Sequence, residues 1–200
     1  MSIVVKENGG RSAPLEAGTY PARCVGVIDL GVQHNDFNSK DQEQVRLIFE
    51  LPTERTEYDG EDRPRWLSKA YTASLHEKST LRKHLEAWRG RAFTAEELMG
   101  FDLRDVLGKP CMVGVKASEK GKAKLDTVSK VMKGVEVPPQ ENETLSLDMD
   151  DPEGAMKVFQ KLPDWMKGEI EKSATWEQVK RGTSGGNWEE DPDDDGDCPF

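Results

Sequence analysis

Apolar and polar residues alternate in several stretches of the first two-thirds of the chain. The alternating stretches are residues 19–30, 44–51, 65–72 and 111–116, and a less regular apolar pattern follows through Leu125, Val128 and Val131. A period of two residues is typical of strands that bury one face. Gly26 lies inside the first stretch, and a glycine within a strand often marks a bulge or a sharp bend. The pattern therefore predicts five strands in a curled sheet.

Polar segments and turn residues separate these strands. We expect residues 31–42 to form a loop and Pro52 to end the second strand. Asp59-Gly60 is a turn signal, so the second and third strands are expected to be antiparallel neighbours.

A helical pattern follows the third strand. Ser74-Leu75-His76-Glu77 has the form of a capping box, in which a hydroxyl and a carboxylate satisfy the first free N–H groups of a helix. Apolar residues then recur at helical spacing as far as Trp88, which is expected in the core, and Gly90 can end the helix in a left-handed conformation. A second box at residues 94–97 predicts a shorter helix.

Three strands, a helical insert and a final hairpin are the element order of an OB-fold barrel. The predicted fold is therefore mainly β, a five-stranded OB-fold-like barrel with a helical insert between strands three and four. Short C-terminal helices and a disordered acidic tail are expected to follow it.

Composition divides the chain into four segments. Residues 1–17 are expected to form an N-terminal arm, and residues 18–137 the OB-fold domain. Residues 138–181 form an acidic linker and short helices, whose apolar residues are expected to dock on the barrel or on another subunit. Residues 182–200 begin with a Gly- and Ser-rich linker and hold too little apolar surface to fold.

The net charge of −10 is unevenly distributed along the chain. Residues 1–134 hold 22 Lys and Arg against 20 Asp and Glu, whereas residues 135–180 hold 5 against 11 and residues 181–200 hold 1 against 7. The first two-thirds of the chain is therefore close to neutral, and the acidity is concentrated behind it. A nucleic-acid partner requires a positive surface, which only the first part can supply.

Basic residues cluster around the third strand, the following helix and the final hairpin, and aromatic residues lie among them. Single-strand binders combine cations that follow the phosphate backbone with rings on which bases stack. Trp66 and Tyr71 fall on opposite faces of their strand, so at least one is expected in the core. The predicted DNA-binding residues are Arg46, Tyr58, Arg65, Trp66, Lys69, Tyr71, Arg82, Lys116, Lys120, Lys122 and Lys124.

The last residues combine a run of acids with an aromatic tip. Seven carboxylates lie within residues 189–197, and Pro199-Phe200 follows. Such a segment can dock its ring in a pocket rimmed by Arg or Lys on a partner; a merely solubilising tail is the alternative. The residues expected to bind partners are Asp193, Asp194, Asp195, Asp197, Pro199 and Phe200.

Signals for catalysis are sparse, and we expect no enzyme activity, cofactor or metal. Gly108-Lys109-Pro110 lacks the other residues of a phosphate-binding loop, and the three histidines have no metal-binding spacing. The three cysteines are far apart and suggest neither a disulfide framework nor a zinc site. This cysteine usage fits a reduced, cytoplasmic setting. No apolar run approaches the roughly 18 residues of a membrane span, so no membrane association is expected.

Residues 69–115 (KAYTASLHEKSTLRKHLEAWRGRAFTAEELMGFDLRDVLGKPCMVGV) resemble a family of tailed-bacteriophage single-stranded-DNA-binding proteins with an OB fold. The segment DDDGDCPF (residues 193–200) is similar to the acidic, aromatic-terminated tips of bacterial and phage proteins of that function. The resemblance implies binding of single strands during phage replication, recombination or repair in the host cytoplasm. It also implies recruitment of replication or recombination proteins through the tail. Homo-oligomerisation is a further possibility left open.

Two other classes of function stay open. A DNA mimic would carry its acidity on a folded surface and regulate a host DNA-binding protein, without affinity for oligothymidine. A nuclease would cleave DNA in the presence of a divalent metal.

Overall fold

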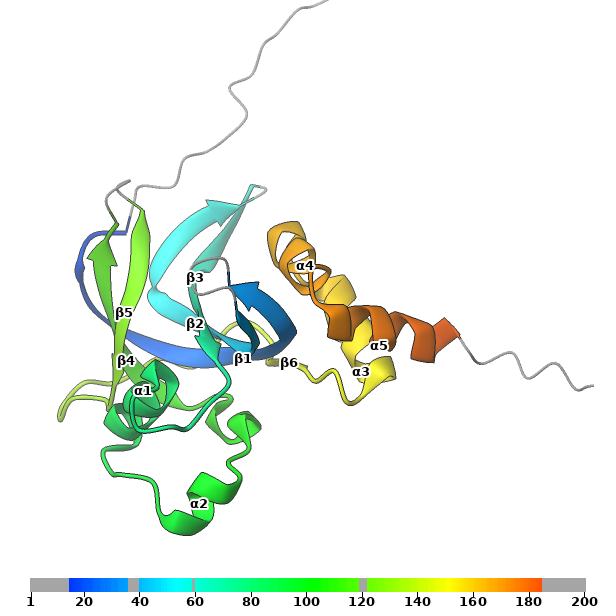
Figure 1. Cartoon of the computed structure of the whole chain (residues 1–200). Coiled ribbons are helices and arrows are strands. Elements are labelled where there is room, and N and C mark those ends of the chain that lie inside the picture. Colours follow the sequence, from blue (N-terminus) through cyan, green and yellow to red (C-terminus); the bar gives the residue numbers. More distant parts are fainter. Residues whose placement is uncertain (1–14, 36–39, 59, 119–121, 185–200) are drawn as a thin grey trace, which may run out of the picture.

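The computed structural model describes residues 15–35, 40–58, 60–118 and 122–184, and this part of the chain is mainly β (Figure 1). Its strands are β1 (Gly18–Asn35), β2 (Lys40–Tyr58), β3 (Glu61–Thr72), β4 (Pro110–Ala117), β5 (Ala123–Ser129) and β6 (Leu145–Leu147). Its helices are α1 (Thr80–Arg89), α2 (Ala95–Met99), the 3-10 helix η1 (Leu103–Val106), α3 (Pro152–Lys161), α4 (Asp164–Ile170) and α5 (Ala174–Ser184).

The strands form one sheet in the order β3-β2-β1-β4-β5, and β6 is added beside β1. Neighbours are antiparallel except β6, which runs parallel to β1. β1 pairs with β4 through its first residues and with β2 through the rest, so the sheet curls along this one long strand. β3 and β5 are the two edge strands of this order. No backbone pairing between them closes the sheet into a barrel.

The predicted bend at Gly26 is confirmed. The register of β1 against β2 shifts between Cys24 and Gly26, which is the mark of a bulge. A Cβ atom at Gly26 would lie 2.7 Å from Cδ1 of Ile48, so a larger residue here would force the Ile48 side chain to shift.

The strands are longer than the alternation predicts. β1 continues to Asn35 and β2 begins at Lys40, so most of the expected loop over residues 31–42 is strand. β2 also continues past Pro52, across an irregularity between Leu51 and Arg55. Both predictions were wrong because the ends of these strands extend beyond the core, where backbone pairing continues although the side chains are polar.

The helical insert lies between β3 and β4 as predicted, but its first boundary differs. α1 begins at Thr80 and not at Ser74, whose hydroxyl instead accepts a hydrogen bond from the N–H of His76 in a local turn. Short polar side chains stabilise such turns as readily as helix starts. The second box is confirmed, since the Thr94 and Glu97 side chains each bind the other's backbone. Gly90 ends α1 in the left-handed conformation.

Two apolar cores lie on the two faces of the sheet. The inner core contains Phe49 and Leu47 together with Trp88 of α1, which is buried as predicted and donates from Nε1 to the Pro110 carbonyl oxygen at 2.8 Å. The outer core joins Ile28 and Ile48 to apolar residues of α3, α4 and α5. The C-terminal helices therefore dock on the outer face of the sheet, one of the two arrangements expected for them (Figure 1).

The segment between β5 and α3 is tied to the sheet by hydrogen bonds with one buried and one half-buried charged side chain. The Glu50 carboxylate, which is fully buried, accepts hydrogen bonds from the backbone N–H groups of Glu141 and Asn142 at 2.7 and 3.0 Å. Arg23 donates to the carbonyl oxygens of Val137 and Pro138 at 3.1 and 2.7 Å. β6 follows within this segment, and the strand prediction missed it because only Leu145 and Leu147 alternate there.

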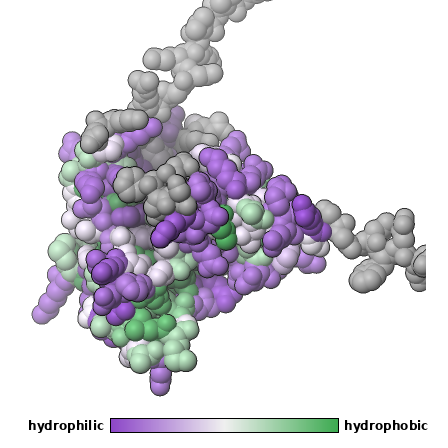
Figure 2. Space-filling model, viewed as in Figure 1, coloured by the Kyte–Doolittle hydropathy of each residue, from purple (hydrophilic) through white to green (hydrophobic). Residues whose placement is uncertain are grey.

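Polar side chains cover most of the molecular face in Figure 2, and a hydrophobic area lies at its lower end. Leu98 and Met99 of α2 are exposed large apolar side chains in that part of the fold. No helix among the described residues has the length and apolar character needed to cross a membrane.

Replacing Gly31 by alanine is expected to destabilise the fold more than replacing Gly60. Both glycines have positive φ angles, 62° and 78°, which cost an L-residue about 1 kcal/mol. A Cβ atom at Gly31 would also lie 2.3 Å from Oγ of Ser173, beside α5, whereas Gly60 has open space. Urea unfolding should show a loss of about 2–4 kcal/mol for Gly31→Ala and about 1 kcal/mol for Gly60→Ala. Equal losses would contradict the packing of the helices on β1.

Candidate nucleic-acid interface

The two end strands of the sheet lie side by side, and we call this boundary the β3–β5 seam. Nζ of Lys69 on β3 donates to the backbone oxygen of Asp126 on β5 at 3.5 Å. Further along, Ala123 of β5 lines a hollow of about 290 Å³ together with Arg65 and Leu67 of β3. Side-chain contacts thus bridge the edges that backbone hydrogen bonds leave unpaired.

Three lysines from three strands lie near one another at the seam, together with the Asp126 carboxylate. Lys116 of β4 is in register with Lys124 of β5, and its ammonium forms an ion pair with Asp126. Desolvation lowers the pKa of Lys69, the Asp126 carboxylate opposes that shift, and Lys124 and Lys116 add to it. The hydrogen bond from Lys116 lowers the pKa of Asp126. One anion among three cations leaves a local excess of positive charge, which suits a polyanion.

Tyr71 and His84 pack beneath Lys69. The Tyr71 side chain is only 4% exposed, and its hydroxyl is 3.0 Å from Nδ1 of His84 on α1. Lys69 Nζ lies 5.6 Å from the centre of the Tyr71 ring. Tyr71 is therefore a core residue that supports the lysine, and its ring is not available to stack on a base. Burial, together with the charge of Lys69, lowers the pKa of His84 to about 4.

Five of the predicted DNA-binding residues lie on β3 or β5 or directly beside them. Arg65 lies on β3 and donates from Nε to the Arg55 carbonyl oxygen at 3.2 Å. Lys122, which is exposed, directly precedes β5. The five residues are Arg65, Lys69, Lys116, Lys122 and Lys124.

The remaining predicted residues are not brought to the seam or lie outside the described part. Arg46 and Trp66 are on the outer face of the sheet, where Arg46 pairs with Glu169 of α4 and Trp66 packs against the outer core. Arg82 of α1 is bound to Glu86 at 2.9 Å and to the Leu75 carbonyl oxygen. Outside the described residues are Lys120, the side chain of Tyr58, and the tail residues Asp193, Asp194, Asp195, Asp197, Pro199 and Phe200.

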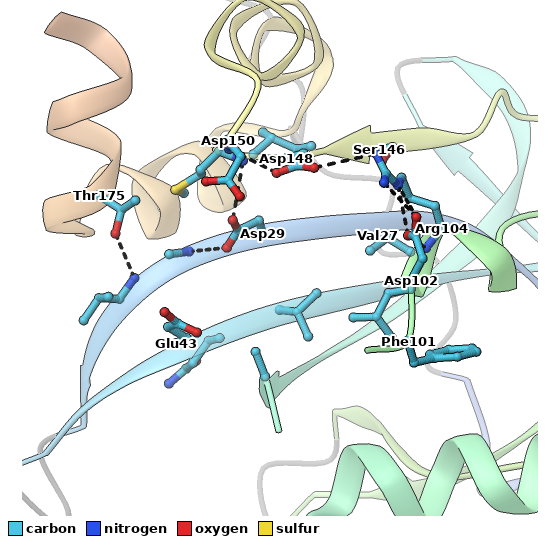
Figure 3. A pocket seen from close by; sticks show the side chains of 18 residues that line it. Val27, Asp29, Glu43, Phe101, Asp102, Arg104, Ser146, Asp148, Asp150 and Thr175 are labelled. Carbon is cyan, nitrogen blue, oxygen red and sulfur yellow. Dashed lines mark hydrogen bonds and ion pairs between the residues drawn. The ribbon is translucent and has the colours of Figure 1, made fainter. Parts of the chain in front are cut away.

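A second hollow, of about 390 Å³, lies where β1, β2, η1 and β6 meet, and it is acidic (Figure 3). Arg104 is the cation in its lining and pairs with Asp102 at 2.7 Å and with Asp148 at 3.7 Å. Burial raises the pKa of Asp29, and Asp148 and Asp150 add to the shift. The carboxylates that line the hollow are Asp29, Glu43, Asp102, Asp148 and Asp150.

This acidic hollow would repel phosphate and is excluded from a nucleic-acid interface. Its carboxylates are scattered over the sequence, so no local pattern could have indicated it. His84 and Asp126 at the seam were likewise not among the predicted site residues, because no local pattern indicates them. Among the described residues, no group of three or more His, Cys, Asp or Glu side chains is arranged to hold a metal ion.

In comparisons with known proteins, no family model matches the chain, and no curated protein or solved structure matches it.

Protonation of His84 is expected to make the fold less stable in weak acid. Its pKa of about 4 in the folded state lies below the ordinary 6.5, so the unfolded chain binds the proton first. The contribution of His84 is complete above pH 6.5 and is lost as the pH falls toward 4. Allowing for its partial exposure, the free energy of unfolding should fall by on the order of 1 kcal/mol between pH 7.5 and 5.0.

Urea unfolding of His84→Gln at the two pH values tests this expectation. The variant should show a smaller fall than the wild type, whereas His76→Gln, at an exposed site, should behave like the wild type. An unchanged pH dependence in His84→Gln would rule out the buried, neutral histidine.

Proposed function

We propose that this chain binds single-stranded DNA along the β3–β5 seam, without sequence preference and without catalysis. The observation that carries the proposal is the convergence of Lys69, Lys116 and Lys124 from three separate strands. Ammonium groups attract phosphates without reading bases, so such a cluster favours binding that is independent of sequence.

We infer that the sheet is an OB-type barrel that is open between β3 and β5. The strand order β3-β2-β1-β4-β5 supports this, because an OB fold places its third and fifth strands next to each other. The helical insert between β3 and β4 agrees with it. OB folds bind oligonucleotides on their second and third strands and the adjoining loops, beside which this seam lies.

The sequence resemblance supplies the biological setting of the proposal. Single strands exposed during phage DNA replication, recombination or repair in the host cytoplasm would be the ligand. The tail would recruit replication or recombination proteins through Pro199-Phe200 and the aspartates before it.

Removing the three central lysines of the seam is expected to weaken binding and reduce its dependence on salt. Lys69→Gln/Lys116→Gln/Lys124→Gln should lower the affinity for oligothymidine roughly 10- to 100-fold at 0.1 M salt. The slope of log affinity against log salt should fall by about 2, at about 0.7 for each lost phosphate contact. Fluorescence titration at several salt concentrations measures both quantities.

A matched control removes the same net charge from α3 and the turn after α4. Lys157→Gln/Lys161→Gln/Lys172→Gln, at exposed positions of α3 and the turn after α4, should bind like the wild type. If the two triple variants lose the same affinity, the effect is one of net charge and the seam is not the interface.

The acidic tail is proposed to compete with DNA for the seam. The Gly- and Ser-rich linker predicted from the sequence would hold it at about millimolar effective concentration, enough to occupy a cationic surface when DNA is absent. Deleting residues 187–200 should therefore tighten binding to oligothymidine and abolish capture of replication or recombination proteins. Unchanged affinity together with unchanged capture would remove this role of the tail.

The acidic hollow favours a second candidate function, a DNA mimic that acts on a host protein. Five carboxylates on a folded surface are what such a protein requires. A mimic would not bind oligothymidine at low salt. The same titration with random duplex, with and without Mg²⁺, also identifies a nuclease by metal-dependent cleavage.

A further inference from the structure

Trp165 is a large aromatic residue that α4 presents to solvent. Its side chain is 57% exposed, whereas Met166 and Ile170 of the same helix are buried in the outer core. The other tryptophans of the described residues, Trp66, Trp88 and Trp176, are half-buried or buried. Helical spacing explains why Met166 and Ile170 face the sheet together, four positions apart, while Trp165 does not.

A largely buried arginine packs against this exposed ring. The Arg46 guanidinium lies 5.1 Å from the centre of the Trp165 ring and is only 11% exposed. One of its nitrogens is 2.6 Å from both carboxylate oxygens of Glu169, and another donates to Oγ of Ser68 at 3.0 Å. One face of the indole therefore rests on an immobilised cation, and such a contact holds an aromatic ring without covering its other face.

Trp165 is close to the edge strand that carries the seam. Arg46 of β2 is directly opposite Ala70 of β3, and Lys69 is the preceding residue. Successive side chains of a strand point to opposite faces, so Lys69 belongs to the seam side and Ala70 to the side of Trp165. β3 is the last strand of the sheet, and its outer face here carries the small side chains of Ser68 and Ala70. A single DNA strand that leaves the seam can cross β3 and reach the Trp165 indole.

We propose that Trp165 stacks on a base of the bound single strand, and that Arg46 is a positioning residue that holds the indole for it. This inference rests on the proposed function and extends the binding surface from the sheet to α4. It also gives Arg46, a predicted DNA contact, a different role, since its guanidinium is occupied by Glu169 and the indole. Stacking needs only a free ring face and reads no sequence, in agreement with the cation cluster at the seam.

Substitutions of Trp165 separate stacking from packing. Trp165→Ala and Trp165→Leu should both lower the affinity for oligothymidine, roughly 5- to 100-fold, because neither side chain has an aromatic face. Trp165→Phe should retain most of the affinity. Leucine keeps apolar bulk over Arg46, so loss of affinity in the leucine variant cannot be attributed to an undocked helix if its thermal unfolding matches the wild type.

The salt dependence distinguishes this contact from those of the lysines. The slope of log affinity against log salt should be the same in Trp165→Leu and the wild type, because stacking releases no counterions. Arg46→Met should lower the affinity less than Trp165→Leu does, because the ring remains but is no longer held. Met99→Ala, at a 90% exposed site on α2, is the matched control and should bind like the wild type.

The two proposals fail in different ways. If Trp165→Leu binds oligothymidine as tightly as the wild type while the triple lysine variant is weakened, the stacking role is overturned and DNA binding at the seam stands. If Trp165→Leu loses affinity together with salt slope, the residue acts through the charged groups and stacking is again overturned. If the wild type does not bind oligothymidine at low salt, the proposed function itself is wrong.

Discussion

Burial of both faces of β1 and β2 is the constraint on which the rest of the structure depends. Alternate residues of these strands pack inward against α1 or outward against α3, α4 and α5, so that Phe49 belongs to the inner core and Ile48 to the outer one. Charged side chains that the packing buries on the central strands need polar partners, as Glu50 and Arg46 show. The seam cations accordingly lie on β3, β5 and β4 and not on β1 or β2.

The lysines at the open edges of the sheet have a structural role as well as the proposed binding role. Unpaired strand edges invite pairing with other chains, and lysines on an edge are one way in which proteins prevent this. Lys69 reaches the Asp126 carbonyl oxygen, and His84 contacts the same backbone group from α1. These side chains hold β3 and β5 together without a backbone ladder. The same ammonium groups give the seam its positive charge.

Charge is segregated in the folded part of the chain as well as along the sequence. Cations gather at the seam, and carboxylates gather around the hollow between β1, β2, η1 and β6. On the outer face of the sheet, Glu169 of α4 neutralises Arg46, while Trp165 of the same helix remains exposed. A polyanion would be attracted to one region and repelled from the other, which orients it on the surface.

The sequence by itself determined the positions of the first five strands though not their full lengths, the helical insert, the bulge at Gly26 and the core position of Trp88, because period and turn chemistry are local properties. It also placed Lys69, Lys116 and Lys124 among the candidate contacts. Only the tertiary structure decided that these lysines meet, that Tyr71 is buried beneath them, and that α4 covers Arg46 and presents Trp165. Those outcomes depend on which edges and faces come together over long sequence separations, and no local pattern of residues specifies them.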